Sequence, residues 1–316
     1  MFGSLFLSEK FFSIAKYINA GFLKKTLSVF SKKLNNNFPN IWSNTPDCID
    51  YDRTIVSTSN WSCTDSEEAY RTHGHKIYDE KSIVYKLNKQ EFRVYETPTT
   101  DQKIACFGCS QTFGSALPDE HTWVYKLNEK LGFDQYTCYN YGLQGASNDT
   151  ISRLVYSLLQ TEKPNAVVCF FPDIFRVEYF NMGKKDGDVL NFWPRVIHVN
   201  KNISSAEYNA YTTITNEYNA FFNFIKNFKL IEALCKLHDI PFVWYTWSLA
   251  VVGLDGCIIK RYLNSDSLIK SDGSLVDLLK DNPECWKDLA RDNIHFGPVF
   301  NNLLAEEFKT LLLKKL

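Results

Sequence analysis

The chain has 316 residues, of which 45% are hydrophobic, and its formal net charge is −1 at pH 7. This length suits one large domain or one domain with an extension, and the near-neutral charge gives no electrostatic basis for nucleic-acid binding. No stretch of the sequence reaches the roughly 18 apolar residues that a membrane-spanning helix needs.

Residues 1–37 are predicted to form one or two amphipathic helices. Apolar residues recur at helical spacing between Phe11 and Phe30, and lysines occupy many of the remaining positions. A basic amphipathic helix can lie on an anionic membrane surface or on a partner protein, but packing on its own domain is the commoner role. We therefore expect this segment to dock on its own chain, with a peripheral membrane or protein contact as the alternative.

Residues 38–102 show little helical periodicity and are predicted to be an accessory segment packed on the main domain. Pro46 and the stretch Thr72–His75 are typical of loops, and Ser82–Glu96 is predicted to form two short strands about Asn88–Gln90. We expect no independent activity in this segment.

From residue 103 to residue 316 the pattern alternates between strand and helix. The expected strands are Lys103–Gly108, Gln135–Asn140, Ala166–Phe171 and Pro241–Thr246, and the expected helices are Trp123–Leu131, Thr150–Gln160, Ala206–His238 and Pro298–Lys315. Such alternation predicts a three-layer α/β/α domain with a parallel sheet covered on both faces. Two irregular stretches, Asn181–Lys201 and Ser248–Cys285, are expected to roof a pocket at the carboxyl ends of the strands.

A serine follows the first predicted strand in KIACFGCSQTFG, residues Lys103–Gly114. A buried strand that ends in small residues and leads into a helix exposes a serine at the carboxyl edge of the sheet, where such sheets bind ligands. Glycines on both sides of Ser110 allow backbone to approach a ligand closely. Ser110 is therefore a candidate nucleophile, although many clusters of this kind are only turns.

Near the other end of the chain, Asp292 stands three residues before His295 in DNIHFG. This spacing lets one short loop or helical turn present both side chains on one side. The aspartate can then fix the tautomer of the histidine, while the far ring nitrogen faces a serine. Ser110, His295 and Asp292 are therefore the candidate catalytic residues.

These motifs resemble those of the SGNH, or GDSL, hydrolase superfamily. GCSQTFG is similar to its first block, Asn140–Ser147 to its second block, and DNIHFG to its last block. The resemblance covers roughly Lys103 to the C-terminus and implies a flavodoxin-like sheet and a serine hydrolase. It also implies an oxyanion hole that includes the backbone N–H groups of Ser110 and Gly145.

Two positions depart from the pattern of the family. Cys109 stands where the family commonly has aspartate, but that position is not the nucleophile. Pro172 follows the strand Ala166–Phe171, where the third block normally supplies an asparagine that donates to the oxyanion. Proline has no side-chain donor and no N–H, so this donor is missing or comes from elsewhere.

Two further residues are candidates for the site. Asn148 lies shortly after Gly145 and can replace the missing donor, although capping a helix is its commoner role. Arg176 can bind an anionic group of the substrate, with a salt bridge to Asp173 or Glu178 as the competing role.

The resemblance favours a serine ester hydrolase that removes acyl groups, such as acetyl, from a carbohydrate or a similar small ester. A non-catalytic binding or structural protein that retains the fold is one alternative, because of Pro172. A sugar O-acyltransferase with the same three residues is the other.

We expect no metal and no cofactor. His73 and His75 could share a metal ion, but no further ligand stands at a spacing typical of a metal site. Nine cysteines without a paired CxxC array favour a reducing compartment. The N-terminus also lacks the order of regions found in a secretory signal, so the cytoplasm is the expected location.

Overall fold

A computed structural model describes residues 52–180, 189–192, 213, 217–246, 278–279 and 281–316. All of these residues fall in one compact unit. The predicted helical segment 1–37 lies outside the described residues, as do most of Asn181–Lys201 and Ser248–Cys285. None of the described helices is both long enough and apolar enough to cross a membrane.

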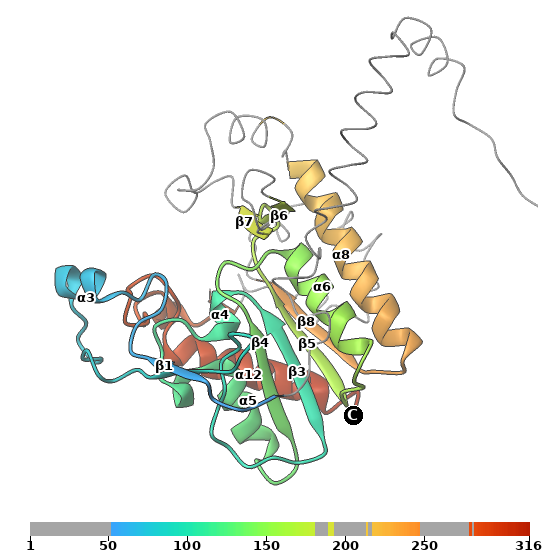
Figure 1. The fold of residues 1–316 in the computed structure, drawn as a ribbon, viewed down its shortest axis with the longest axis horizontal. Helices are drawn as coiled ribbons and strands as arrows, with labels where there is room; N and C mark the ends of the chain where they lie inside the picture. Colours follow the sequence, from blue (N-terminus) through green and yellow to red (C-terminus); the bar gives the residue numbers. More distant parts are fainter. Residues whose placement is uncertain (1–51, 181–188, 193–212, 214–216, 247–277, 280) are drawn as a thin grey trace, which may run out of the picture. The chain divides into compact units, whose positions relative to one another are not determined.

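Four parallel strands of the described residues form the central sheet (Figure 1). They are β3 (Lys103–Gly108), β4 (Thr137–Gly142), β5 (Ala166–Phe171) and β8 (Phe242–Thr246), in the order β4-β3-β5-β8. Among these four strands β3 comes first in the sequence, and it lies between β4 and β5, which follow it. In a doubly wound sheet this is the point where the strand order reverses and where ligands bind at the carboxyl edge.

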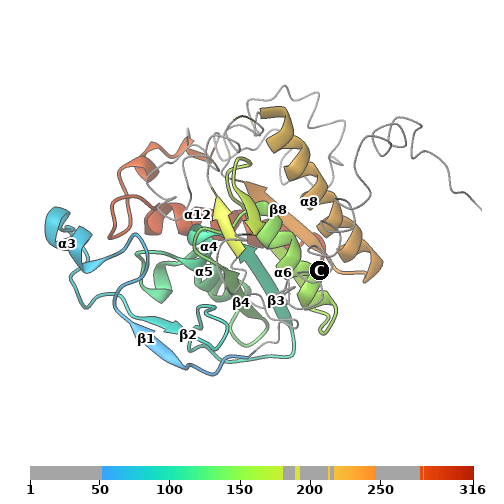
Figure 2. The same cartoon turned by 45° about the horizontal axis from the view of Figure 1, so that its top comes forward.

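Helices cover both faces of this sheet, so the predicted three-layer α/β/α fold is confirmed (Figure 2). One face carries α5 (Trp123–Leu131) and α12 (Pro298–Leu312), and the other carries α6 (Asn148–Leu159) and α8 (Glu217–Leu237). Successive residues of β3 serve opposite faces, because side chains alternate along a strand. Ile104 packs with α5 and α12, whereas Ala105 packs with α6 and α8.

The main elements lie close to their predicted positions. Strands β3 and β5 and helix α5 have the predicted bounds, while β4 begins and ends two residues later than expected. Helix α6 begins earlier than predicted, because Ser147 caps it in a capping box with Thr150. An antiparallel pair, β6 (Val177–Phe180) with β7 (Val189–Phe192), was not predicted.

The accessory segment has more regular structure than its sequence suggested. Of the two short strands predicted within Ser82–Glu96, the first is β2 (Tyr85–Leu87), which pairs with β1 (Ser57–Ser59). The second is reduced to an isolated bridge between Arg93 and Leu87, beside which the Val94 N–H donates to the Lys86 carbonyl oxygen at 2.8 Å. Thr72 and His73 belong to α3 (Glu67–His73) rather than to a loop, because the Ser66 side chain caps this helix and acidic residues fill its first turn.

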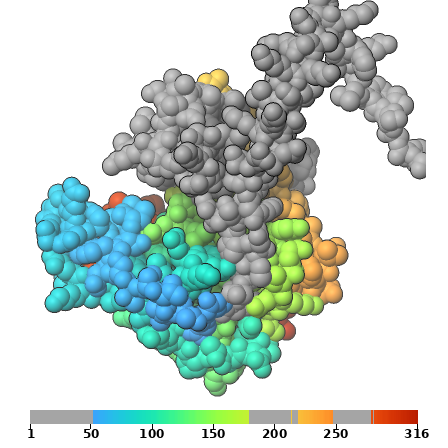
Figure 3. All heavy atoms as spheres, viewed as in Figure 1, coloured from blue at the N-terminus to red at the C-terminus, as the bar shows by residue number. Residues whose placement is uncertain are grey.

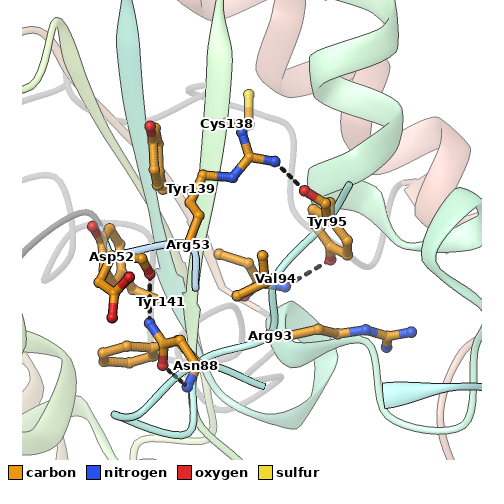
Figure 4. Close-up of a pocket in the computed structure, with 11 residues that line it drawn as sticks. Asp52, Arg53, Asn88, Arg93, Val94, Tyr95, Cys138, Tyr139 and Tyr141 are labelled. Carbon is orange, nitrogen blue, oxygen red and sulfur yellow. Dashed lines mark hydrogen bonds between the residues drawn. The ribbon is translucent and has the colours of Figure 1, made fainter. Parts of the chain in front are cut away.

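The accessory segment lies against the edge strand β4 at a small pocket (Figure 4). Here the Arg53 guanidinium lies 5.7 Å from the centre of the Tyr139 ring and donates to the Tyr95 carbonyl oxygen. The Asn88 side chain also donates to the Asp52 carbonyl oxygen at 2.8 Å. These contacts cover the exposed edge of the sheet, and the space-filling view shows the blue residues of this segment seated against the green residues of the main domain (Figure 3).

The turn after β3 depends on close packing that only glycine permits. A Cβ atom at Gly108 would lie 1.9 Å from Thr112 Oγ1 and 2.8 Å from the Phe170 carbonyl oxygen. The helix α4 (Ser110–Phe113) can therefore begin directly at the end of β3, over the neighbouring strands.

We predict that Gly108→Ala lowers the free energy of unfolding by about 3 kcal/mol, because Thr112 and the Phe170 backbone would have to move. Gly74→Ala is the comparison: Gly74 has φ +60° and ψ 179°, a region almost confined to glycine, and nothing lies within 4 Å of the position that a Cβ atom would take, so its loss of about 1–3 kcal/mol comes from backbone strain alone. Urea unfolding measures both variants, and a loss below about 1 kcal/mol in Gly108→Ala would show that close packing at Gly108 is not the constraint.

Candidate active site

Ser110 is the first residue of α4, directly after β3 at the carboxyl edge of the sheet. Its N–H therefore has no partner within the helix and points out from the N-terminal end. Cys109 occupies the N-cap position and is fully buried, with Sγ 4.0 Å from Ser110 Oγ. Ser110 itself is 9% exposed, so the hydroxyl lies in a largely water-excluded place that still opens to solvent.

The structure brings Ser110, His295 and Asp292 together. His295 Nε2 lies 2.8 Å from Ser110 Oγ, and His295 Nδ1 lies 2.6 Å from Asp292 Oδ2. Both distances fall within the range for a nucleophile, a base and a residue that orients the base. Ser110 comes from the start of α4 and the other two from one loop, and the nearest of them in sequence, Asp292, is 182 positions from Ser110, since 292 − 110 = 182.

Asp292 is held by four hydrogen bonds. Its Oδ1 accepts from the backbone N–H groups of Ile294 and His295, each at 3.0 Å. Its Oδ2 accepts from the His295 ring and from Thr64 Oγ1, the latter at 2.8 Å. Burial alone would raise the pKa of Asp292, but the bonds from the His295 ring and backbone outweigh it and hold that pKa below 3.8.

The loop after β4 carries the second group of predicted site residues. Gly145 adopts φ +77° and is exposed, and nothing lies within 4 Å of the position that a Cβ atom would take there. Glycine adopts this left-handed conformation without strain, and its missing side chain leaves room for a bound group beside the backbone. The Gly145 N–H is thus accessible, as an oxyanion donor must be.

Asn148 does not cap a helix, so this alternative for its role is wrong. Ser147 is the N-cap of α6, and its hydroxyl accepts from the Thr150 N–H at 3.2 Å. Asn148 is the next residue and is fully buried, yet neither its Nδ2 nor its Oδ1 has a hydrogen-bond partner among the described residues. A buried amide without partners costs free energy, which makes it a candidate for a group that acts on a ligand.

Pro172 directly follows β5, at the position expected from the sequence, so no side-chain amide can reach the site from there. Arg176 is largely buried, and its Nη1 lies 3.4 Å from the Ala146 carbonyl oxygen, beside Gly145. Glu178, one of the acidic partners considered for Arg176, is bound by Arg153 Nε at 3.1 Å. Arg176 thus lies next to the Gly145 loop.

Sequence reasoning missed the residues of the accessory segment that contact the site. Thr64 donates to Asp292, and Arg93 donates from Nη1 to the Gly114 carbonyl oxygen at 2.6 Å and from Nη2 to that of Leu117 at 2.7 Å. Arg93 therefore fixes the end of α4. A long-range contact from an irregular segment has no periodic signal, although an arginine within an apolar stretch, as in Phe92–Tyr95, hints at a buried partner.

Comparisons with known proteins found remote matches among solved structures. No family profile and no curated protein matches the sequence. Solved structures that match include a lipolytic protein of the G-D-S-L family from Veillonella parvula, with 13% identity and TM-score 0.40 over 67% of this chain and 98% of that one. Another is the psychrotrophic esterase EstA from a Pseudoalteromonas species, with 12% identity and TM-score 0.42 over 68% and 98%.

A two-domain esterase active on acetylated mannans also matches, with 13% identity and TM-score 0.40 over 67% of this chain and 48% of that one. At identities of 12–13% and TM-scores of 0.40–0.42, these likenesses decide neither the family nor the fold of this chain. The parallel α/β/α sheet is established by its own strand order, and the roles of the site residues depend on the geometry of this chain.

The lowered pKa of Asp292 predicts how stability depends on pH. Its pKa is lower in the folded chain than the unfolded value of about 3.8, so the unfolded chain binds more protons in this window. The stabilisation by Asp292 is therefore fully present above the unfolded pKa and is lost as pH falls through the folded pKa.

We predict that Asp292→Asn lowers the free energy of unfolding at pH 7, and that its difference from the parent shrinks as pH falls below about 4. Urea unfolding of both proteins between pH 3 and pH 8 measures this difference. A difference that stays constant over the range would contradict the hydrogen bonding described for Asp292.

Proposed function

We propose that this protein is a serine ester hydrolase in which Ser110 is the nucleophile, His295 the general base and Asp292 the residue that orients His295. The observation that carries the proposal is the continuous hydrogen-bonded chain from Ser110 Oγ through the His295 ring to Asp292 Oδ2. All three side chains are largely buried at the switch point of a parallel sheet.

In the first step Ser110 Oγ attacks the ester carbonyl carbon, and His295 Nε2 takes the hydroxyl proton. The Asp292 carboxylate accepts from Nδ1–H, so the tautomer with a free Nε2 lone pair faces the serine and the imidazolium that forms is stabilised. The tetrahedral intermediate then expels the alcohol, which receives the proton from His295. Water, activated by the same histidine, releases the acyl group from Ser110.

The negative charge that develops on the carbonyl oxygen needs donors that already point at it. We assign this role to the backbone N–H groups of Ser110 and Gly145 and to the Asn148 side-chain amide. Ser110 starts a helix and Gly145 borders open space, which supports the first two. The buried Asn148 amide has no partner among the described residues, and this supports it as the replacement for the donor that Pro172 cannot supply.

An acyl ester of a carbohydrate, such as an acetyl ester, is the substrate class that we propose. Trp286 is 55% exposed and packs its ring edge against Phe296, the residue after His295, with ring centres 5.8 Å apart. An exposed indole that packs against the loop of the base can stack on a sugar ring. Arg176, next to the Gly145 loop, is proposed to bind an anionic group of the substrate.

Hydrolysis of p-nitrophenyl acetate tests the proposal. We expect turnover by the parent, loss of turnover in Ser110→Ala and nearly unchanged turnover in Cys109→Ser, because the buried Cys109 side chain is not the nucleophile. Loss of activity in Cys109→Ser alone would indicate thiol chemistry. A parent without turnover on any activated ester would favour the non-catalytic alternative, and transfer of the acyl group to an added sugar would favour an acyltransferase.

The role of Asn148 gives a second prediction. Asn148→Ala is expected to lower kcat roughly 10- to 1000-fold with little change in KM, because the interaction forms mainly in the transition state. Stability should change little, since the amide that is removed has no partner among the described residues.

Asn128 in α5 is the matched control. It is also buried, but its Nδ2 donates to the Tyr136 carbonyl oxygen at 2.6 Å and its Oδ1 accepts from the Cys138 N–H at 3.0 Å. Asn128→Ala should therefore lower the free energy of unfolding by about 2 kcal/mol and leave kcat little changed. Steady-state kinetics and urea unfolding of both variants measure these differences. Full activity of Asn148→Ala would contradict the role of Asn148 as an oxyanion donor.

A further inference from the structure

A tight turn of the accessory segment, Ser62–Asp65, reaches the candidate active site. Its two ends pair with each other: the Ser62 N–H donates to the Asp65 carbonyl oxygen at 2.9 Å, and the Asp65 N–H donates to that of Ser62 at 3.1 Å. Cys63 and Thr64 form the tip. Cys63 adopts φ +53°, a left-handed conformation that residues other than glycine disfavour.

The turn contacts two loops of the main domain that carry site residues. Thr64 Oγ1 donates to Asp292 Oδ2 at 2.8 Å. Ser62 Oγ donates to Gln144 Oε1 at 2.9 Å, and Gln144 directly precedes Gly145. The Gln144 amide in turn donates to Ser115 Oγ, just after α4, at 2.7 Å.

A buried ion pair fixes the base of the turn. Asp65 is 1% exposed and receives Nε and Nη2 of Arg291 at 2.8 and 2.7 Å, in the bidentate geometry typical of strong pairs. The Tyr85 hydroxyl also donates to Asp65 Oδ2, at 2.6 Å. Because Arg291 directly precedes Asp292, this ion pair ties the loop that carries Asp292 to the turn that carries Thr64.

We propose that the turn Ser62–Asp65 is a positioning element of the active site, in which Thr64 orients the Asp292 carboxylate and Ser62 supports the loop of Gly145. This inference rests on the proposed function, because it assigns the turn to the same site. The N-terminal accessory segment then completes the site that the C-terminal domain carries.

The geometry of Asp292 explains why a second donor matters. The two backbone N–H groups of its own loop bind Oδ1, whereas the His295 ring binds Oδ2. Without Thr64, the bond to the histidine would be the one contact that holds Oδ2 among the described residues. The Thr64 hydroxyl adds a donor from a separate, anchored element, so the plane of the carboxylate and hence the direction of Nδ1–H become fixed.

The strained tip is consistent with this role. Cys63 keeps a disfavoured backbone conformation, and its neighbour Thr64 is exposed apart from the hydrogen bond to Asp292. Strained residues persist where the surrounding structure determines them, and they cluster at active sites. Here the ion pair between Asp65 and Arg291 holds the turn in place, and the tip of the turn places the Thr64 hydroxyl against the Asp292 carboxylate.

Thr64→Val removes the hydroxyl and keeps the shape of the side chain, while Thr64→Ser retains the hydroxyl. Thr58→Val is the matched control, since Thr58 is an exposed threonine of β1 in the same segment. The probe is an alkyl fluorophosphonate, whose second-order rate of attachment to Ser110 is followed by mass spectrometry. The Nδ1–H proton of His295 is followed by one-dimensional proton NMR in the same four proteins.

We expect the labelling rate of Thr64→Val to fall about tenfold, as for the loss of one hydrogen bond to a charged group, while Thr64→Ser and Thr58→Val stay close to the parent. The Nδ1–H signal should shift in this variant alone.

An unchanged Nδ1–H signal and labelling rate in Thr64→Val would overturn the positioning role. A parent that is not labelled at Ser110 would overturn the proposed function instead, and a shifted Nδ1–H signal in Thr64→Val would then still support Thr64 as the residue that positions Asp292. A uniform loss of labelling in all three variants, with no shift of the Nδ1–H signal in any of them, would mean that the segment contributes stability only, and this result also overturns the inference.

Discussion

The candidate site depends most on the hydrogen bonds and the ion pair that the buried guanidinium of Arg291 makes. A charge removed from water is tolerated only when it is paired and its donors are satisfied. Arg291 is 1% exposed and donates to Asp65, to the carbonyl oxygens of Asp79 and Glu80, and to that of Asn60. All of these acceptors lie in the accessory segment. The loop that presents Asp292 and His295 is therefore built between two parts of the chain that are far apart in sequence.

A second buried arginine, Arg93, belongs to the accessory segment and donates to groups of the main domain. Arg93 pairs with Asp119 at 2.8 Å and donates to the carbonyl oxygens of Gly114 and Leu117, just after α4. A cation at the C-terminal end of a helix is favourable. One arginine thus fixes the helix of the proposed nucleophile and the other fixes the loop of the proposed base, so both halves of the site depend on the same segment.

The sequence was informative where the signal is local. The strand before Ser110 and helix α5 follow from periodicity and capping, and the spacing of Asp292 and His295 places both side chains on one loop. The contact between Thr64 and Asp292 could not be predicted, because it joins residues 228 positions apart and the turn that carries Thr64 has no periodic pattern. Asn148 was assigned a competing role as a cap because an asparagine at the start of a helix commonly caps it, but the capping box with Thr150 places Ser147 in that position.

Under the proposed function, Asn148 supplies the oxyanion donor that Pro172 cannot. A donor after β5 would be presented at the switch point by the end of a strand, and proline removes it. Asn148 stands at the start of α6, after the neighbouring strand β4, and parallel strands bring their carboxyl ends to one edge. An amide buried there without a partner among the described residues lowers stability, and folding alone gives no reason to retain it. The proposed reaction, which develops negative charge at that edge, would give one, because the amide would find its partner in the transition state.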